Sequence, residues 1–129
     1  MISAVLVSTT SIESIWPHVK HFIEKCDGEV STSEDLYPLL IEGKRFLCLA
    51  IDGIEVKGAG IYRVVHGFKD KVVMTTLGGS GADWNDAITD FSKQMVTLGF
   101  NRLEVQGRRG WLKTLKSFNE MHTTIGMDL

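Results

Sequence analysis

The amino-acid sequence predicts one domain of the α+β or α/β class, with a mixed, mostly antiparallel central sheet flanked by helices. Three observations point to this architecture. Apolar residues recur every three or four positions in several segments, which is typical of amphipathic helices. Two strand-like segments are joined by Asp52-Gly53, a dipeptide that favours a hairpin turn. Further along, a strand, a helix and a strand follow one another, which is the order of a parallel crossover.

The composition agrees with a single domain over residues 1–129. The chain has 43% apolar and 23% charged residues, as globular proteins do, and its net charge of -2 gives no general attraction to nucleic acid. It contains no apolar run of the roughly 20 residues that cross a bilayer, and its start lacks the basic region of a signal peptide. We therefore expect a cytoplasmic protein without a membrane anchor. Cys26 and Cys48 are expected to be reduced thiols, with Cys48 in the core.

The first third of the chain has the pattern of a strand followed by two helices. Residues 1–8 form an apolar strand, and residues 12–26 carry an apolar stripe at helical spacing. A shorter helix is predicted over residues 34–41, with Gly43 as its left-handed end. His18 and His21 lie three positions apart on the first helix, but no acidic or cysteine ligand accompanies them. We interpret both as ordinary histidines and predict no metal site.

The middle of the chain is predicted to form three antiparallel strands. Residues 45–51 and 54–65 make the hairpin around Asp52-Gly53, and residues 71–76 are the third strand. Gly58 and Gly60 interrupt the second strand. Such glycines predict a bulge or a place where another backbone or a ligand comes close.

A glycine-rich stretch separates the third strand from the longest helix. Gly78, Gly79, Ser80 and Gly81 are predicted to break the regular backbone, and an apolar helical stripe runs from Trp84 to a cap at Gly99. A glycine loop that leads into a helix start exposes unpaired N–H groups, which favour an anion such as a pyrophosphate. The alternative is a turn in which the glycines only satisfy backbone geometry.

The C-terminal part alternates as a strand over residues 101–106, with Leu103 and Val105 on the opposite side from Glu104. A basic loop at 107–110, a short helix at 111–118 and one closing strand at 120–129 are predicted to follow. Residues 101–129 carry five bases against three acids, so this end is the expected face for an anionic ligand. The excess is too small to predict a nucleic-acid site.

This order of elements resembles the GNAT superfamily of N-acetyltransferases over nearly the whole chain. In that family, the loop between the fourth strand and the third helix binds acetyl-CoA, and the pantetheine arm inserts between the fourth and fifth strands. The loop carries Gln or Arg, two variable residues, Gly, one variable residue, then Gly or Ala. Gly79 and Gly81 meet the two small positions here, whereas Thr76 replaces the basic or amide residue. The resemblance implies that the cofactor is held by Thr76, Leu77, Gly78, Gly79, Ser80, Gly81 and Ala82.

The resemblance also implies an activity, the transfer of an acetyl group from acetyl-CoA to an amine of a small molecule or a protein. Glu104 is the candidate general base, because it is the only carboxylate available on the fourth or fifth strand; a strand glutamate is as often solvated or ion-paired. Arg108 and Arg109 are candidate partners of the cofactor's 3′-phosphate. The alternative for this basic loop is a solvated surface.

Two departures favour an alternative function. The helix at 111–118 lacks the Tyr with which many family members protonate the leaving thiolate, and one closing strand is predicted where a typical member has two. The segment 107–129 resembles compact acetyltransferase-like proteins of tailed bacteriophages. The alternative is thus a non-catalytic binding or structural module with a protein partner in a phage assembly, located in the host cytoplasm or the virion.

Overall fold

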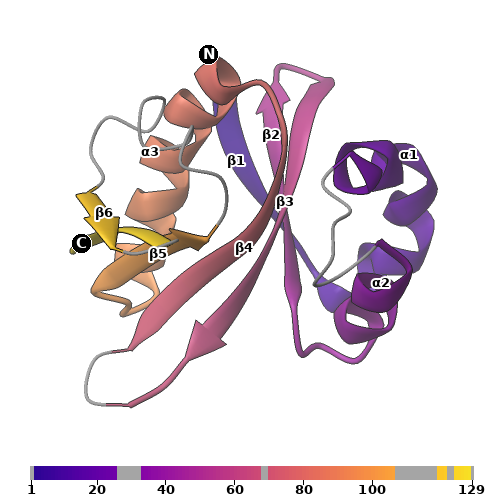
Figure 1. Cartoon of the computed structure of the whole chain (residues 1–129). Helices are drawn as coiled ribbons and strands as arrows, with labels where there is room; N and C mark the ends of the chain where they lie inside the picture. The colour runs from indigo at the N-terminus through magenta and orange to yellow at the C-terminus, as the bar shows by residue number, and fades with distance from the viewer. Residues whose placement is uncertain (1, 26–32, 68–69, 107–118, 122–123, 129) are drawn as a thin grey trace.

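The computed structural model describes residues 2–25, 33–67, 70–106, 119–121 and 124–128 (Figure 1). Its strands form one mixed sheet in the order β1-β2-β3-β4-β5-β7-β6. The pairing is antiparallel except between β4 and β5, which are parallel. In chain order the elements are β1 (Ile2–Val7), the 3-10 turn η1 (Thr9–Ser11), α1 (Ile12–Glu24), α2 (Ser33–Ile41), β2 (Phe46–Asp52), β3 (Glu55–Val65), β4 (Lys71–Gly79), α3 (Gly81–Thr97), β5 (Arg102–Gln106), β6 (Asn119–Met121) and β7 (Thr124–Asp128).

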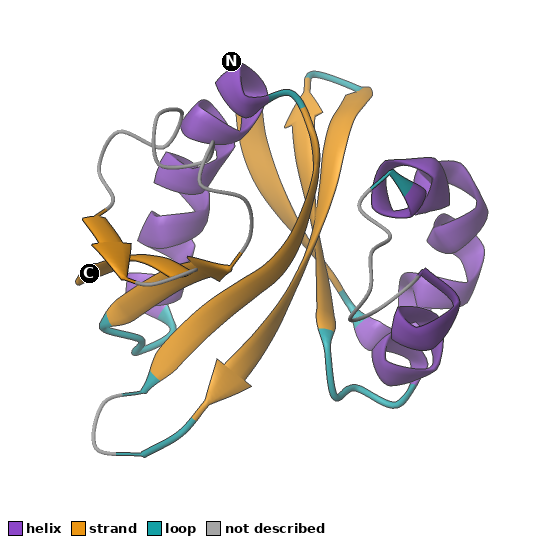
Figure 2. Cartoon of the chain, viewed as in Figure 1, coloured by secondary structure: helices purple, strands orange, loops and turns teal. Residues whose placement is uncertain are grey.

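The helices cover the two faces of the sheet, which confirms the predicted architecture (Figure 2). α1 and α2 bury Ile12, Val19 and Leu40 against the side chains of β2 and β3 on one face. α3 buries Trp84 and Phe91 on the other face, against every second residue of β4 and β5. Each face therefore has its own apolar core, and the sheet separates the two.

Most predicted elements are confirmed with small shifts at their ends. The β2–β3 hairpin turns at Gly53, which has a φ of 64°, and α3 is followed by Gly99 at 97°. In β5, Leu103 and Val105 are buried in the core on the α3 side, as their alternation predicted. The predicted basic loop and short helix at residues 107–118 lie outside the described residues, as does Cys26.

Two predictions about the backbone are wrong. Gly78 does not break the regular backbone, because β4 continues to Gly79, where φ becomes positive, and α3 starts at Gly81 rather than at Trp84. The closing segment forms β6 and β7, paired from Met121 with Thr124, rather than one strand. The sequence carries no Asn-Gly or Asp-Gly dipeptide between the two strands, so the alternation of apolar residues resembled that of a single strand.

The outer edge of β1 is held by side chains of α3. The backbone N–H of Ala4 donates to Asp90 Oδ2 at 2.8 Å, and Gln94 Nε2 donates to the Ala4 carbonyl at 2.8 Å. Gln94 also donates to Asp90 Oδ2 at 3.2 Å, which fixes the two side chains relative to each other. An edge strand otherwise presents unpaired backbone groups, so this contact satisfies both groups of Ala4.

Replacing Asp90 with alanine is expected to lower the free energy of unfolding by about 1–3 kcal/mol, because the Ala4 N–H then loses a charged acceptor. Chemical denaturation followed by circular dichroism measures the change. Asp86→Ala, at an exposed position of the same helix, is the control and should change stability by less than about 0.5 kcal/mol. Equal effects of the two substitutions would show that the Ala4 contact contributes little.

Candidate functional site

The strands β4 and β5 pair over only the first half of β4. Their parallel register runs from Lys71 with Arg102 to Met74 with Val105, whereas β4 continues to Gly79 and stays paired with β3 on its other side. Within the described residues, β5 thus offers no partner to the last part of β4 (Figure 1). Backbone N–H and C=O groups at such an edge can pair with an extended ligand.

A bulge lies where the two strands part. The β3–β4 register pairs Tyr62 with Met74 but Ile61 with Thr76, so Thr75 is an extra residue. Its Oγ1 donates to the Ile61 carbonyl at 3.2 Å. A bulge increases the local twist of a strand, which turns β4 away from the direction of β5.

The free part of β4 leads directly to the start of α3. Ser80 is the N-cap, and its Oγ accepts from the Asp83 N–H at 3.1 Å and donates to Asp83 Oδ2 at 2.8 Å. The first two helical N–H groups, those of Gly81 and Ala82, have no acceptor inside the helix. They lie at the positive end of the helix dipole, and the exposed Ala82 leaves this turn open to an anion.

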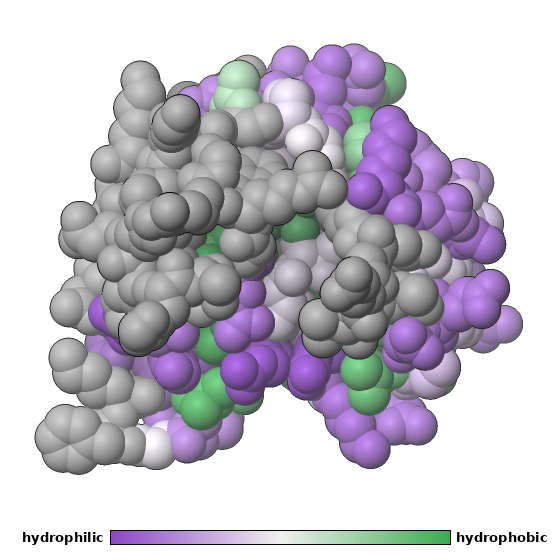
Figure 3. Space-filling model, in the orientation of Figure 1, coloured by the Kyte–Doolittle hydropathy of each residue, from purple (hydrophilic) through white to green (hydrophobic). Residues whose placement is uncertain are grey.

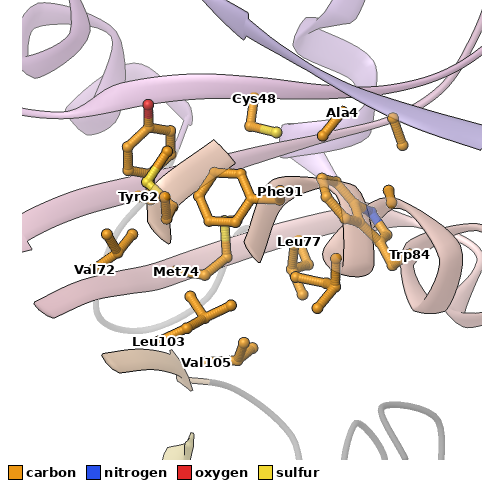
Figure 4. Close-up of a cluster of buried hydrophobic side chains, with 14 residues drawn as sticks. Ala4, Cys48, Tyr62, Val72, Met74, Leu77, Trp84, Phe91, Leu103 and Val105 are labelled. Carbon is orange, nitrogen blue, oxygen red and sulfur yellow. The ribbon is translucent and has the colours of Figure 1, made fainter. Parts of the chain in front are cut away.

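Trp84 fixes the junction between β4 and α3. Its side chain is fully buried, and the indole Nε1 donates to the Gly78 carbonyl at 2.9 Å. A Cβ on Gly58 would lie 2.9 Å from Trp84 Nε1, and one on Gly60 would lie 3.0 Å from the edge of the ring. The two β3 glycines therefore make room for the indole, whose buried position Figure 4 shows. The predicted bulge and close backbone approach are confirmed at Gly58, because the β2–β3 register shifts beside it and a Cβ on it would lie 2.5 Å from the Gly78 carbonyl oxygen.

Close contacts also require glycine at two positions of β4. A Cβ on Gly78 would lie 2.1 Å from the Phe22 carbonyl oxygen of α1, so only glycine allows the helix to pack here. Gly79 has a φ of 124°, and a Cβ on it would lie 2.7 Å from the Lys57 carbonyl oxygen. Both positions require glycine for packing and backbone geometry, whatever ligand they meet.

The predicted loop residues divide into a buried and an exposed group. The side chains of Thr76 and Leu77 are buried, so these residues can meet a ligand only through the backbone. Gly79, Ser80 and Ala82 are exposed. Arg108 and Arg109 lie outside the described residues.

Lys57 is a cation at this site that the sequence did not reveal. It precedes Gly58, the β3 partner of Gly79, and its Nζ lies 3.2 Å from Glu55 Oε1. The pKa of Lys57 is raised, mainly by its hydrogen bond and charge interaction with Glu55, with a smaller contribution from Asp83 in the first turn of α3. Lys57 is the extra residue of a bulge in β3, because Ala50 pairs with Gly58 and Ile51 with Val56. Gly58 predicted such a bulge, but strand register alone brings Lys57 beside Gly79.

Glu104 lies on β5 beside the point where the strands part. Its Oε2 accepts from Lys71 Nζ at 3.1 Å and from Arg102 Nε at 3.0 Å, and its side chain is only 11% exposed. Burial alone would raise the pKa of Glu104, but the hydrogen bonds and charges of Arg102 and Lys71 together outweigh it and lower the pKa. A carboxylate with a lowered pKa is a weaker proton acceptor.

No group of three or more His, Cys, Asp or Glu side chains in the described ranges is arranged to hold a metal ion. His18 and His21 are exposed on α1. Cys48 is a free thiol buried in the core. Among the described residues, no helix is long and apolar enough to span a bilayer.

Glu104→Gln is expected to lower stability by about 2 kcal/mol at neutral pH, because both cations lose a charged acceptor. Since the folded-state pKa lies below the ordinary value of 4.5, the ion pairs stabilise the protein above that pH. The difference from the native chain should shrink as pH falls below 4.5 and through the lowered pKa. Urea denaturation at pH 7 and at several acid pH values measures it.

The control for that experiment is Glu24→Gln. Glu24 forms an exposed ion pair with Lys20, and such pairs contribute less than about 1 kcal/mol. A Glu104→Gln effect as small as that of the control, or one that does not change with pH, would contradict the assigned ion pairs.

Gly78→Ala is expected to destabilise the fold by about 1–3 kcal/mol, because α1 must move away from the new Cβ. Thermal and urea denaturation provide the measurement. Gly67→Ala is the matched control, since a Cβ at Gly67 meets nothing within 4 Å. Equal stability of the two variants would mean that α1 yields at no cost.

Comparison with known proteins shows which solved structures have a similar fold. No protein-family model matches the sequence, and no curated protein matches it. Three solved structures are similar. They are Tetrahymena GCN5 (TM-score 0.71, 11% identity, covering 99% of this chain and 95% of that chain), a Bacillus subtilis acetyltransferase in complex with CoA (0.68, 10%, 100% and 99%) and an aminoglycoside acetyltransferase from an uncultured soil metagenomic sample in complex with sisomicin (0.61, 15%, 89% and 83%).

The similarity extends over nearly all of this chain and of the compared chains, at identities that establish the fold alone. It confirms the resemblance that was based on the order of elements, and the role of the glycine positions stays a prediction. The bacteriophage origin stays a prediction. The chain has the GNAT fold that these acetyltransferases share.

Proposed function

We propose that this chain is an acyl-CoA-dependent N-acyltransferase that transfers an acetyl group from acetyl-CoA to an amine of a small molecule or a protein. One observation carries the proposal: β4 continues past the end of its pairing with β5 and leads directly to the open amino end of α3. A similar structure, the Bacillus subtilis acetyltransferase, was crystallised with CoA.

The residues around this edge fit an acyl-CoA. The backbone of β4 beyond Met74 is placed to pair with the amides of a pantetheine arm. The N–H groups of Gly81 and Ala82 are placed to receive a pyrophosphate at the helix start. Because Gly79 has no Cβ, the backbone stays accessible between the two, and Lys57 lies beside it as a cation.

Acetyl-CoA supplies an activated thioester. The amine nitrogen forms a bond to the acetyl carbon while the carbon–sulfur bond breaks. The amine loses one proton, and the departing thiolate gains one to become the thiol. The protein's main contribution is to hold the two reactants together, which can lower the barrier by several kcal/mol, roughly 7–11 in well-oriented cases. Glu104 is proposed to orient Lys71 and Arg102 rather than to act as the base, because both cations engage its Oε2 and its pKa is lowered.

Ala82→Asp separates cofactor binding from folding. A carboxylate in the first turn favours the helix dipole, so the melting temperature should stay the same or rise. The same charge would repel a pyrophosphate at the neighbouring N–H groups, so the affinity for CoA should fall at least tenfold. The native chain is expected to bind with a micromolar Kd, which corresponds to a binding free energy of about -8 kcal/mol. Isothermal titration with CoA and acetyl-CoA measures the affinity.

Thr89→Glu is the matched control, because it adds one negative charge at an exposed position near the middle of α3. Its affinity for CoA should equal that of the native chain. An equal loss of CoA affinity in both variants would indicate a general charge effect and contradict a pyrophosphate site at the start of α3. Failure of the native chain to bind CoA at millimolar concentration would overturn the proposed function in favour of a non-catalytic module with the same fold.

A further inference from the structure

A row of basic side chains crosses the sheet on the face that carries α1 and α2. We name it the basic strip, and it consists of Arg45, Arg63, Lys71 and Arg102. Strand register brings Arg63, Lys71 and Arg102 together from β3, β4 and β5, and Arg45 directly precedes β2. Lys71 pairs directly with Arg102, and Arg63 pairs with Val73, the β4 residue that in turn pairs with Glu104. Arg45 precedes Phe46, the partner of Tyr62, and so lies beside Arg63.

Side-chain alternation places the three strand residues of the strip on one face. Val72 and Leu103 belong to the core under α3, so their neighbours Lys71 and Arg102 point to the opposite side. Ile61 and Leu47 belong to the core under α1 and α2. Arg63, two positions after Ile61, shares that face, and Arg45 directly precedes the first residue of β2.

The strip is an island of positive charge on a chain whose net charge is -2. On this face Glu104 lies beside the strip, and the β5–β7 register pairs Arg102 with a second acidic residue, Asp128. Lys44 is adjacent but is paired with Glu42 at 3.0 Å. Arg63 is half-buried and forms no ion pair with any residue in the described ranges. Figure 3 shows hydrophilic residues next to hydrophobic ones in the lower part of this view.

The strip lies next to the point where β4 and β5 part. Val73 with Glu104 is the pair just before Met74 with Val105, the last pair of the two strands. Lys71 is three residues from Met74, or about 10 Å along an extended strand, and four adjacent strands span about 14 Å across. A group bound on the strip is thus within the length of a small molecule from the strand edge assigned to the acyl donor.

From this placement we infer that the acceptor carries a carboxylate or phosphate group in addition to its amine, and that the basic strip binds this anionic group. The inference rests on the proposed function and specifies its acceptor. Arginine guanidinium groups bind carboxylate and phosphate oxygens through paired hydrogen bonds, so Arg63 and Arg45 supply specificity as well as charge. Polycationic amines would be repelled by the same strip.

The test compares amines that differ only in an anionic group. Thiol release from acetyl-CoA by the full chain is measured with glucosamine 6-phosphate against glucosamine, with tyrosine against tyramine, and with spermidine as a polycation. The phosphate and carboxylate arms distinguish the two kinds of anion. We expect kcat/KM to be at least tenfold higher for the anionic member of one pair, with spermidine the poorest acceptor.

Arg63→Gln tests the strip directly. It should raise KM for the preferred anionic acceptor about threefold to tenfold and leave kcat nearly unchanged. The kinetic constants for the matched amine without the anionic group should not change. Arg63→Lys should recover part of the affinity. Lys93→Gln, which removes one exposed charge from α3, is the control and should match the native chain. Equal use of anionic and neutral twins, or equal effects of the Arg63 and Lys93 substitutions, would overturn the inference.

A titration that needs no turnover distinguishes this inference from the proposed function. Amide shifts in NMR spectra are followed as each amine is added, with and without CoA. Shifts at the basic strip with the anionic twin alone support the inference even if CoA does not bind, a result that would overturn only the acyltransferase proposal. CoA binding without shifts at the strip from either anionic amine would overturn the inference and leave the acyltransferase proposal standing.

Discussion

The hydrogen bond from the Trp84 indole to the Gly78 carbonyl is the interaction on which the candidate site depends. An indole N–H buried without an acceptor would cost about 1–3 kcal/mol, so the fully buried ring must keep this partner. The bond joins the last part of β4 to the first turn of α3. It therefore sets where the strand stops and where the unpaired helical N–H groups lie. The free strand edge and the unpaired N–H groups of the helix start are thus two ends of one junction.

Three glycines on two neighbouring strands provide the space for that junction. Gly58 and Gly60 accommodate the ring from β3, and Gly78 accommodates the backbone of α1. A Cβ at Gly58 or Gly78 would meet backbone, at 2.5 Å from the Gly78 carbonyl oxygen and 2.1 Å from the Phe22 carbonyl oxygen. A Cβ at Gly60 would meet only side chains, at 3.0 Å or more. The two interpretations of the glycine-rich stretch, an anion site and a geometric requirement, are thus compatible: the glycines shape the strand end, and the helix start offers the N–H groups.

Much of the fold was predictable because it depends on local patterns. The hairpin at Asp52-Gly53, the alternation around Leu103 and the left-handed end at Gly99 each follow from a few neighbouring residues. The strand through Gly78 was not predictable, since glycine normally weakens a strand and only contacts with Phe22 and Trp84 explain it there.

The candidate site was predictable only in part, for the same reason. The loop positions around Gly79 follow from the family's spacing. The cation Lys57 beside them, and the ion pairs of Glu104, arise from register between strands that are far apart in sequence. Glu104 shows the consequence: the sequence marks it as the one available carboxylate, but the two cations that lower its pKa come into view only when β4 and β5 are aligned.

The side chains that hold Ala4 affect how this molecule meets its neighbours. Asp90 and Gln94 occupy, at the middle of β1, the backbone groups with which a strand from a second molecule would pair. A charged carboxylate at that place also disfavours stacking of chains into a continuous cross-β array. Strand addition at the β1 edge of the sheet is thereby disfavoured at Ala4, and with it the formation of fibrils by this edge at high protein concentration.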